Sequence, residues 1–380
     1  MRVIYLVTTL RHGIGGHIYS LQTTAGSLME QIDVEIVNIG IKPSPVLDNS
    51  KINYQFIFCN GFNFLSVIKK LNVIIKNNEP DILHAFDDKA FLFARIVSYK
   101  NKIPIILTKC GGENQKKYPY NKDLVLFSQE NIDFYKSYNK FKSARFHFIP
   151  NRVAQFSDNN LLIDEIKRKI GNRISILRIT RISTYYEDSI LQSIRLIDHL
   201  VAEGYKNVIL VIIGVVESKD VLRKISSPNI LLFTDEKYTK NAKKLINAFD
   251  FVIGTGRGLM EAASKGKILL SPSKYYKFPI LVDRFVFKNL LSTNFSERNN
   301  PNIKEEDNFN KILRCIDSVD EQQKITAFSN EIFDKYFNIK SVTNQYLELY
   351  QNSEPAVLTG NIFYHFLFVI KEFLFFYIKS

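Results

Sequence analysis

The stretch 2–28, RVIYLVTTLRHGIGGHIYSLQTTAGSL, decides the fold because it joins three features in order. Residues 2–7 form a short apolar and β-branched run that is typical of a buried strand. A glycine-rich turn follows, with Gly15 and Gly16 at its end. Beyond the turn, apolar residues recur at spacings of three and four, as on one face of a helix: Ile18, Leu21, Ala25 and Leu28. A strand that leads through a glycine turn into a helix opens a βαβ unit, so a parallel sheet is predicted.

The same alternation continues along most of the chain. Further strands are predicted in the first half at 33–37, 53–57, 81–84, 103–107, 124–128 and 144–149. After a break at 149–153, a second series is predicted with strands at 174–179, 207–214, 229–234, 251–254 and 267–271 and helices at 188–203, 240–249 and 258–265. We therefore predict an α/β protein with two Rossmann-like domains on parallel sheets, at 1–152 and 153–350, followed by a separate helix at 358–380.

The composition limits the kinds of molecule that the protein is expected to bind and the compartment in which it is expected to occur. A hydrophobic content of 46% is that of a globular protein, and the formal net charge of +13 would suit nucleic acid, an anionic membrane or a phosphorylated substrate. The sequence has no basic stripe and no recognisable nucleic-acid-binding module, so we expect no nucleic-acid partner. Cys59, Cys110 and Cys315 have neither disulfide nor zinc spacing, which fits a reducing compartment. The apolar run at the N-terminus is too short for a signal peptide, so a cytoplasmic location is expected.

An aromatic run lies at the end of the chain. Residues 362–378 contain six phenylalanines and two tyrosines, interrupted by His365, Lys371 and Glu372. The run is too short and too charged to span a bilayer, which needs roughly 20 mostly apolar residues. On a helix, polar residues would form one stripe opposite a wide aromatic face: Asn361, His365, Glu372 and Lys379. This pattern predicts a helix that lies in the interface of an anionic membrane, and the alternative is a helix packed on the protein's own core.

A second glycine-rich turn, Gly-Thr-Gly-Arg-Gly-Leu at 254–259, lies between a predicted strand and a predicted helix, and Glu261 follows in the helix. Such a turn can hold a diphosphate at the start of a helix, and the carboxylate can accept hydrogen bonds from sugar hydroxyls. Arg178 and Arg181 follow the first strand of the same predicted domain, where ligands bind in open parallel sheets. The alternative is that Arg178 and Arg181 are surface arginines and Glu261 is a first-turn glutamate favoured by the helix dipole.

These signals together resemble the retaining family-four glycosyltransferases. The motifs are individually degenerate, and their order carries the resemblance over about residues 1–275. In this chain they are Gly15-Gly16, Pro-Asp-Ile-Leu-His at 80–84, Ile-Pro-Ile-Ile-Leu-Thr at 103–108, Ile-Pro-Asn at 149–151, Arg-Ile-Thr-Arg at 178–181, Val-Ile-Ile-Gly at 211–214 and Glu-Ala-Ala-Ser-Lys-Gly at 261–266. The resemblance implies a GT-B fold, with a nucleotide-sugar donor mainly in the C-terminal domain and an acceptor mainly in the N-terminal one.

The resemblance also implies roles. Gly16 would contact the donor phosphates, Arg181 would neutralise the diphosphate and Glu261 would hold the ribose, so Arg181 and Glu261 are the predicted catalytic residues. The other donor-binding candidates are Gly15, Arg178, Gly256, Gly258 and Leu259, and the acceptor-side candidates are His17, His84, Cys110 and Glu113. The sequence contains no Asp-x-Asp triplet, so we expect transfer without a metal. The resemblance implies retaining transfer from a nucleotide sugar, here expected to be UDP- or GDP-linked, with no cofactor. We expect the acceptor to be a polyprenyl-linked glycan of the cell surface, at the inner face of the plasma membrane.

The chain departs from the family pattern at three positions. Ile253 stands where a second glutamate is frequent, Tyr186 where a lysine is expected, and Cys110 where a histidine is common. A catalytically weakened member is therefore an alternative. A second alternative is a nicotinamide-dependent sugar-nucleotide oxidoreductase or epimerase, with Glu35 as the acid that would bind the ribose. Ile18 interrupts the Gly-x-Gly-x-x-Gly fingerprint that such an enzyme needs, which counts against it.

Overall fold

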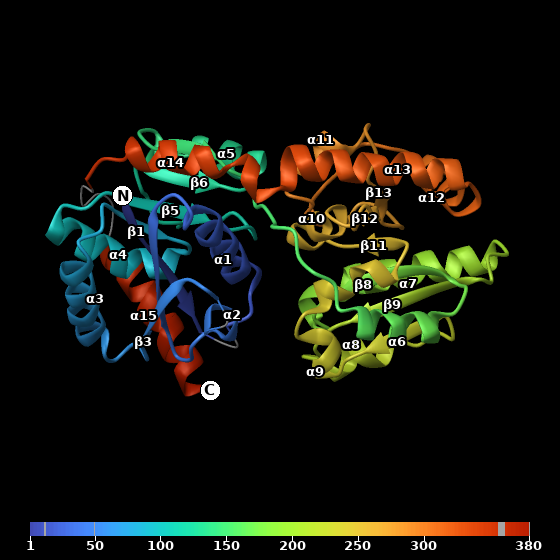
Figure 1. The fold of residues 1–380 in the computed structure, drawn as a ribbon, viewed down its shortest axis with the longest axis horizontal. Helices are drawn as coiled ribbons and strands as arrows, with labels where there is room; N and C mark the ends of the chain where they lie inside the picture. Colours follow the sequence, from blue (N-terminus) through green and yellow to red (C-terminus); the bar gives the residue numbers. More distant parts are fainter. Residues whose placement is uncertain (11–12, 49, 356–361, 380) are drawn as a thin grey trace. The chain divides into compact units, whose positions relative to one another are not determined.

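The computed structural model describes residues 1–10, 13–48, 50–355 and 362–379. It divides the chain into two compact units (Figure 1). Unit 1 comprises Met1–Arg152 and Ile339–Ser380, and unit 2 comprises Val153–Asn338. The sequence predicts 153–350 as one domain, whereas the structure places residues 339–350 in unit 1, because the chain returns to the first sheet after unit 2.

Unit 1 is built on a seven-stranded parallel sheet with the strand order β3-β2-β1-β4-β5-β6-β7. Each strand predicted in the first half of the chain is present. The bounds are β1 (Arg2–Thr9), β2 (Asp33–Gly40), β3 (Asn53–Phe58), β4 (Ile82–Ala85), β5 (Ile105–Lys109), β6 (Asp123–Leu126) and β7 (Arg145–Phe148). Neighbours in the order run parallel throughout, with Tyr5 of β1 opposite Ile36 of β2 and His84 of β4.

Helices cover both faces of this sheet (Figure 1). Successive strand residues point to opposite faces, so β1 contributes Tyr5 to one hydrophobic cluster and Leu6 to the other. The Tyr5 cluster includes side chains of α1 (Gly16–Leu28), α2 (Pro45–Asp48) and α14 (Thr343–Gln351). The Leu6 cluster includes α3 (Phe64–Asn78), α4 (Asp88–Asn101), α5 (Gln129–Lys136) and α15 (Ile362–Ile378). Short 3-10 turns, η1 (Asn139–Phe141) and η5 (Ile339–Ser341), complete the unit.

A buried chain of hydrogen bonds fixes α14 on the sheet. The hydroxyl oxygens of Tyr5 and Tyr350 are 2.6 Å apart, and the Tyr350 hydroxyl is 2.9 Å from Nδ1 of His84. Nε2 of His84 is 2.7 Å from the hydroxyl oxygen of Thr108 on β5. All four side chains are buried, so a break in this chain would leave polar groups unpaired inside the core.

Unit 2 is built on a six-stranded sheet with the order β10-β9-β8-β11-β12-β13. The strands are β8 (Ile174–Ile179), β9 (Val208–Ile213), β10 (Ile230–Phe233), β11 (Phe251–Ile253), β12 (Ile268–Ser271) and β13 (Ile280–Leu281). All pairs are parallel except β12 with the short edge strand β13. The predicted pair of Rossmann-like α/β folds is thus confirmed, and β13 is an addition that the sequence pattern did not indicate.

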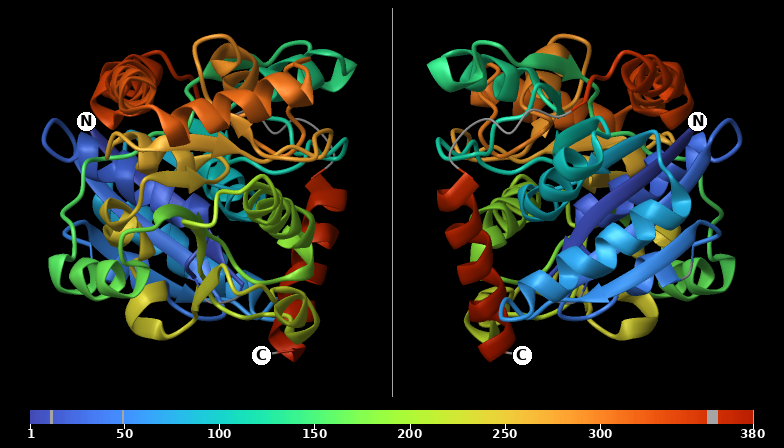
Figure 2. Two further views of the ribbon diagram at one scale, coloured as in Figure 1. Left: turned by 90° about the vertical axis from the view of Figure 1, so that its right-hand side faces the viewer. Right: turned by 90° about the vertical axis from the view of Figure 1, so that its left-hand side faces the viewer.

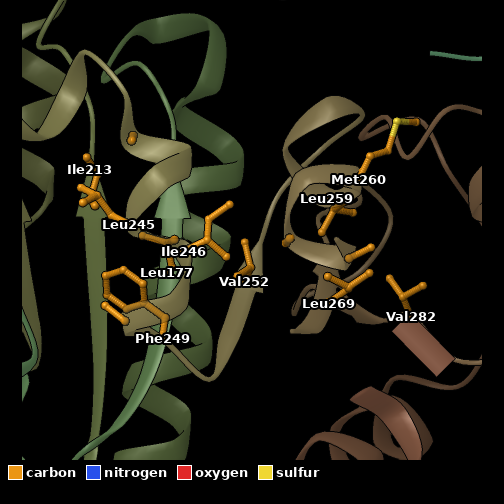
Figure 3. Packing of buried hydrophobic residues seen from close by; sticks show 14 of the residues in the cluster. Leu177, Ile213, Leu245, Ile246, Phe249, Val252, Leu259, Met260, Leu269 and Val282 are labelled. Atoms are coloured by element: carbon orange, nitrogen blue, oxygen red, sulfur yellow. The ribbon is translucent and has the colours of Figure 1, made fainter. Parts of the chain in front are cut away.

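Two hydrophobic clusters cover the faces of the second sheet. One gathers side chains of α7 (Glu187–Ala202) and α12 (Glu305–Asp317) against β8, β9 and β11. The other includes Leu177 and Ile213 of the sheet with Leu245 and Ile246, as Figure 3 shows. Its helical members come from α6 (Asn160–Ile170), α9 (Glu236–Thr239), η3 (Ala242–Ala248), α10 (Arg257–Ala263), α11 (Phe287–Ser292), α13 (Val319–Ile332) and the π-helical turn η4 (Phe333–Phe337). The other short elements are η2 (Thr184–Tyr186) and α8 (Lys219–Lys224).

The C-terminal helix α15 packs on unit 1 with one face only (Figures 1 and 2). Val369 and Phe373 are fully buried against the Leu6 cluster. His365 donates a hydrogen bond from Nε2 to the backbone oxygen of Asp88, at 2.8 Å. His365, one residue of the predicted polar stripe, therefore points into unit 1 and does not face solvent. Among the described residues, no helix is both long and apolar enough to cross a membrane.

The buried imidazole makes unit 1 sensitive to acid. Burial lowers the pKa of His84 from 6.5 to about 3, so below pH 6.5 the unfolded chain takes up a proton that the folded chain does not. We expect the free energy of unfolding of unit 1 to fall by about 1.4 kcal/mol per pH unit between pH 6.5 and 4.5, relative to a His84→Gln variant. Urea denaturation at several pH values, followed by circular dichroism, measures both slopes. Equal slopes for the wild type and the His84→Gln variant would contradict the assignment of this acid sensitivity to His84.

Candidate functional site

The glycine turn of unit 1 is shaped to leave space at the start of α1. Gly15 is the N-cap residue and makes no side-chain capping bond, and the first helical turn contains no acidic residue. A Cβ built on Gly16 would meet nothing within 4 Å. A Cβ on Gly15 would lie 2.7 Å from the ring of His17, so this imidazole folds back over the turn. The start of α1 therefore presents backbone N–H groups to an anion beside a histidine ring.

The side chains of two predicted acceptor-side residues, His84 and Cys110, are engaged by other groups of unit 1. His84 is completely buried and both its ring nitrogens are engaged by Tyr350 and Thr108, so the structure removes it from the candidates. Cys110 donates from Sγ to the backbone oxygen of Phe86, at 3.3 Å. Burial raises the pKa of the Cys110 thiol well above its usual range, so it stays protonated and is a poor nucleophile.

Other polar groups lie at the carboxyl ends of the strands of the first sheet. Glu113 is exposed in the loop after β5 and remains a candidate for the acceptor. Asp87 accepts from the backbone N–H and the hydroxyl of Thr8, at 2.7 and 2.8 Å, and caps α4 through the N–H of Ala90. Lys109, at the end of β5, is buried, with Nζ 3.4 Å from the backbone oxygens of two loop glycines. The sequence analysis did not select Asp87 or Lys109, although both follow predicted strands.

The glycine turn of unit 2 has a backbone that requires glycine. Gly256 caps α10 with a φ of 46°, a left-handed conformation that side chains disfavour. A Cβ on Gly256 would lie 3.5 Å from the side-chain amide of Asn294, whereas one on Gly258 would meet nothing within 4 Å. The side chain of Leu259 is completely buried in the core. Leu259 can therefore take part in binding only through its backbone.

Glu261 lies one helical turn beyond this glycine turn and is held by cations. Nε of Arg257 donates to Oε1 of Glu261 at 2.9 Å, and Nζ of Lys243 lies 4.0 Å from the same oxygen. The side chains of Arg257 and Glu261 are each 12% exposed. The hydrogen bond from Arg257 fixes the direction of the carboxylate.

The two arginines after β8 differ in their surroundings. Arg181 is half-exposed, with Nη1 3.3 Å from Oε1 of Glu217, and its guanidinium lies over the ring of Tyr186 at 5.4 Å. Tyr186, which replaces the lysine of the family pattern, thus positions Arg181. Arg178 is 2% exposed and donates from Nη2 to Ser189 at 2.8 Å, with Glu297 at 4.0 Å. Burial lowers the pKa of Arg178 to about 10.

The structure therefore corrects the prediction for Arg178. Its guanidinium ends inside unit 2, where it cannot reach a donor in solution, and it is not a surface arginine either. Arg181 and Glu261 lie in the same unit but have separate partners. The loop that carries Asn294 and Glu297 was missed by the sequence analysis, because it contains no glycine turn or motif. Among the described residues, no group of three His, Cys, Asp or Glu side chains could hold a metal ion.

Comparison with known proteins identifies a matching family over part of the chain. Residues 15–143 match the family described as Glycosyl transferase 4-like, which covers the glycine turn and most of the first sheet. The match confirms the resemblance to this family over that part of the chain. Among curated proteins, none matches the sequence.

Several solved structures share the fold of the chain. HepE from Anabaena, solved in complex with UDP, is 14% identical, with 92% of this chain and 100% of HepE covered and a TM-score of 0.67. A glycosyltransferase from Rickettsia africae is 15% identical, with 92% and 98% covered and a TM-score of 0.68. The UDP-GlcNAc 2-epimerase of Neisseria meningitidis is 13% identical, with 93% and 100% covered and a TM-score of 0.53. These likenesses confirm the predicted GT-B fold.

Proposed function

We propose that the protein is a glycosyltransferase that moves a sugar from a UDP- or GDP-linked donor to a lipid-linked intermediate of a surface polysaccharide. The observation that carries the proposal is the Glycosyl transferase 4-like match over 15–143, on a chain with the fold of solved glycosyltransferases. Each unit also places a glycine turn at the start of a helix that follows a parallel strand. In open α/β sheets, this edge is where nucleotide ligands bind.

In the proposed donor site, three features of unit 2 act together. The turn around Gly256 receives the diphosphate on backbone N–H groups, and Arg181 offsets the charge that develops on the leaving phosphate. Glu261, oriented by Arg257, accepts hydrogen bonds from the ribose hydroxyls. HepE was solved in complex with UDP, which favours a UDP-linked donor here.

The proposed transfer is retaining and needs neither a metal nor a cofactor. Breaking the bond between the sugar and the diphosphate requires stabilisation of the departing phosphate, which positioned cations and amide dipoles can provide. In a front-face reaction the leaving phosphate oxygen takes the proton of the acceptor hydroxyl, so no side-chain base is required. On the acceptor side, His17 and Glu113 are the residues that we assign to glycan binding.

The proposed acceptor is a polyprenyl-linked glycan, so the chain would work at the inner face of the plasma membrane. Two features favour this location. The protein carries a net charge of +13, and α15 leaves part of its aromatic surface uncovered. Attachment from the cytoplasmic side would bring the enzyme to a substrate that stays in the bilayer.

A sugar-nucleotide epimerase is the second candidate, and the likeness to the Neisseria UDP-GlcNAc 2-epimerase favours it. A nicotinamide-dependent oxidoreductase is less well supported, since Glu35 is buried and hydrogen-bonded to Gln55 within the sheet. Incubation with a nucleotide sugar alone distinguishes these activities. An epimerase converts the sugar without an acceptor, whereas a transferase releases nucleoside diphosphate when an acceptor is added.

Loss of either charged donor-site residue should weaken nucleotide binding. We expect Arg181→Ala and Glu261→Ala each to weaken the binding free energy of the nucleoside diphosphate by about 1–3 kcal/mol, because a charge-assisted hydrogen bond is lost. Isothermal titration calorimetry measures the change. Arg223→Ala and Glu236→Ala, two exposed positions of unit 2, serve as matched controls. Affinities that equal the wild-type value in both test variants would remove the donor-site assignment.

A side chain at Gly16 should stop transfer without disturbing the fold. Because the space around Gly16 is open, a valine side chain there should not disturb the fold. It would, however, occupy the space in which we place the phosphate or the acceptor. We expect Gly16→Val to keep the wild-type melting temperature and lose turnover. Gly26→Ala in the same helix, where a Cβ would only touch Ile52 at 4.0 Å, should keep both. Normal turnover in Gly16→Val would show that the turn does not contact substrate.

Chelation should not affect turnover. Because positioned side chains and backbone dipoles stabilise the leaving phosphate in our proposal, excess EDTA should leave the rate unchanged. The measurement is release of nucleoside diphosphate with and without chelator. Inhibition that Mg²⁺ or Mn²⁺ reverses would overturn the proposed mechanism.

A further inference from the structure

An apolar surface on unit 1 is formed by two segments that lie far apart in the sequence. One is the outer side of α15, where Phe363, Tyr364, Leu367, Phe368, Phe375, Tyr377 and Ile378 are exposed. The other is the β3–α3 turn with the start of α3, where Phe62 of the turn is 75% exposed and Leu65 of the helix is 74% exposed. We call these nine residues the aromatic face. They remain uncovered by the described part of the chain, although large apolar residues usually gather inside a protein.

Contacts show that the two segments lie side by side. A Cβ on Gly61, next to Phe62, would lie 3.0 Å from Cγ of Leu374 in α15. Phe64, next to Leu65, packs edge-on against Phe366 with ring centroids 4.9 Å apart. The ring of Phe58 at the end of β3 contacts Tyr377 in the same way, at 6.3 Å. The segment that carries Phe62 and Leu65 therefore lies directly beside the helix.

Two exposed lysines lie at the aromatic face. Lys371 is on the outer side of α15 and Lys379 directly follows the helix, with Nζ of Lys379 4.2 Å from the ring centroid of Phe375. Lys89 of α4 lies 5.6 Å from the ring centroid of Phe368, but its ammonium group is paired with Asp88 at 3.3 Å and adds no free charge. The single acid of the helix, Glu372, is half-buried and interacts with Lys89. Aromatic side chains with lysines among them match the interface of an anionic bilayer, where rings enter the headgroup region and ammonium groups meet lipid phosphates.

We propose that the aromatic face is a preformed docking surface for an anionic lipid bilayer, made jointly by α15 and the β3–α3 turn. The inference rests on the proposed function and specifies its membrane partner further, since it names the surface and assigns it to unit 1. The inner side of α15 is already packed on the core through Val369 and Phe373, so the helix exists before it meets a membrane. Docking then carries no cost of folding the helix, and the bound surface is larger than the helix alone provides.

A second copy of the chain is a less suitable occupant. Lys371 lies in the middle of the outer side of α15, and a dimer through this face would bury its ammonium group. The one acid of the helix points toward Lys89, so it could not compensate that charge across the interface. An unpaired buried charge is strongly destabilising, whereas a lipid headgroup supplies the matching phosphate.

The test is co-flotation of the full-length protein with vesicles of phosphatidylcholine containing 30% phosphatidylglycerol, and with vesicles of phosphatidylcholine alone. We expect binding to the anionic vesicles and at least about tenfold weaker binding to the neutral ones. Phe62→Ser with Leu65→Ser, and separately Phe363→Ser with Leu367→Ser, should each reduce binding to anionic vesicles about tenfold or more. Lys371→Glu with Lys379→Glu should abolish the preference for anionic lipid.

Phe285→Ser provides the control, because Phe285 is 88% exposed on unit 2 and lies outside the aromatic face. It should bind vesicles like the wild type, and circular dichroism should show all variants folded. Wild-type protein that fails to float with anionic vesicles would overturn the proposal, as would turn variants that bind normally. Light scattering that detects a dimer dependent on the aromatic face would also overturn it. Since flotation needs no turnover, a protein that binds vesicles but transfers no sugar would refute the proposed function and leave the docking surface intact.

Discussion

The buried contact of Tyr350 with Tyr5 and His84 anchors α14 on the first sheet. It acts together with apolar packing, because Ile339, Val342 and Leu349 lie in the same buried cluster as Tyr5. Because α14 is fixed there, α15 can follow and cover the Leu6 cluster of the same unit. The aromatic surface therefore belongs to the unit that we assign to the acceptor, and not to the donor unit.

The same contact explains why His84 is not a substrate ligand. Catalytic histidines occur at such positions next to strand ends. In His84, however, both ring nitrogens are engaged in structural hydrogen bonds. The candidate site consists instead of backbone turns and a few oriented charges. Arg257 holds Glu261, and Tyr186 with Glu217 holds Arg181, so the charges that face the proposed donor are positioned before it binds. Such preorganisation reduces the reorganisation that a charged leaving group would otherwise demand.

Periodicity was sufficient to predict most of the fold. All seven strands of the first sheet and five of the six in the second begin and end within three residues of the predicted positions, because buried parallel strands have continuous apolar runs. The two-residue strand β13 was too short to leave a pattern. The domain boundary at 350 depended on long-range burial of Tyr346 and Tyr350, which a local pattern cannot reveal. For the site, the glycine turns were visible in the sequence, whereas the burial of Arg178 and the nearness of Glu297 depend on tertiary packing. The aromatic helix was predicted correctly as a helix, but the division of its aromatic residues between core and surface required the structure.

The central claim is that the protein uses a nucleotide sugar as donor for transfer. It is tested most directly by calorimetric titration with UDP-, GDP-, ADP- and CMP-sugars, followed by analysis of the product formed with a membrane extract that contains polyprenyl-linked glycans. The account predicts that one nucleoside diphosphate sugar binds, that its nucleotide is released only when the extract is present, and that the sugar appears on the lipid-linked product with its anomeric configuration retained. Conversion of the sugar without an acceptor, or binding of a nicotinamide dinucleotide in place of every nucleotide sugar, would contradict it.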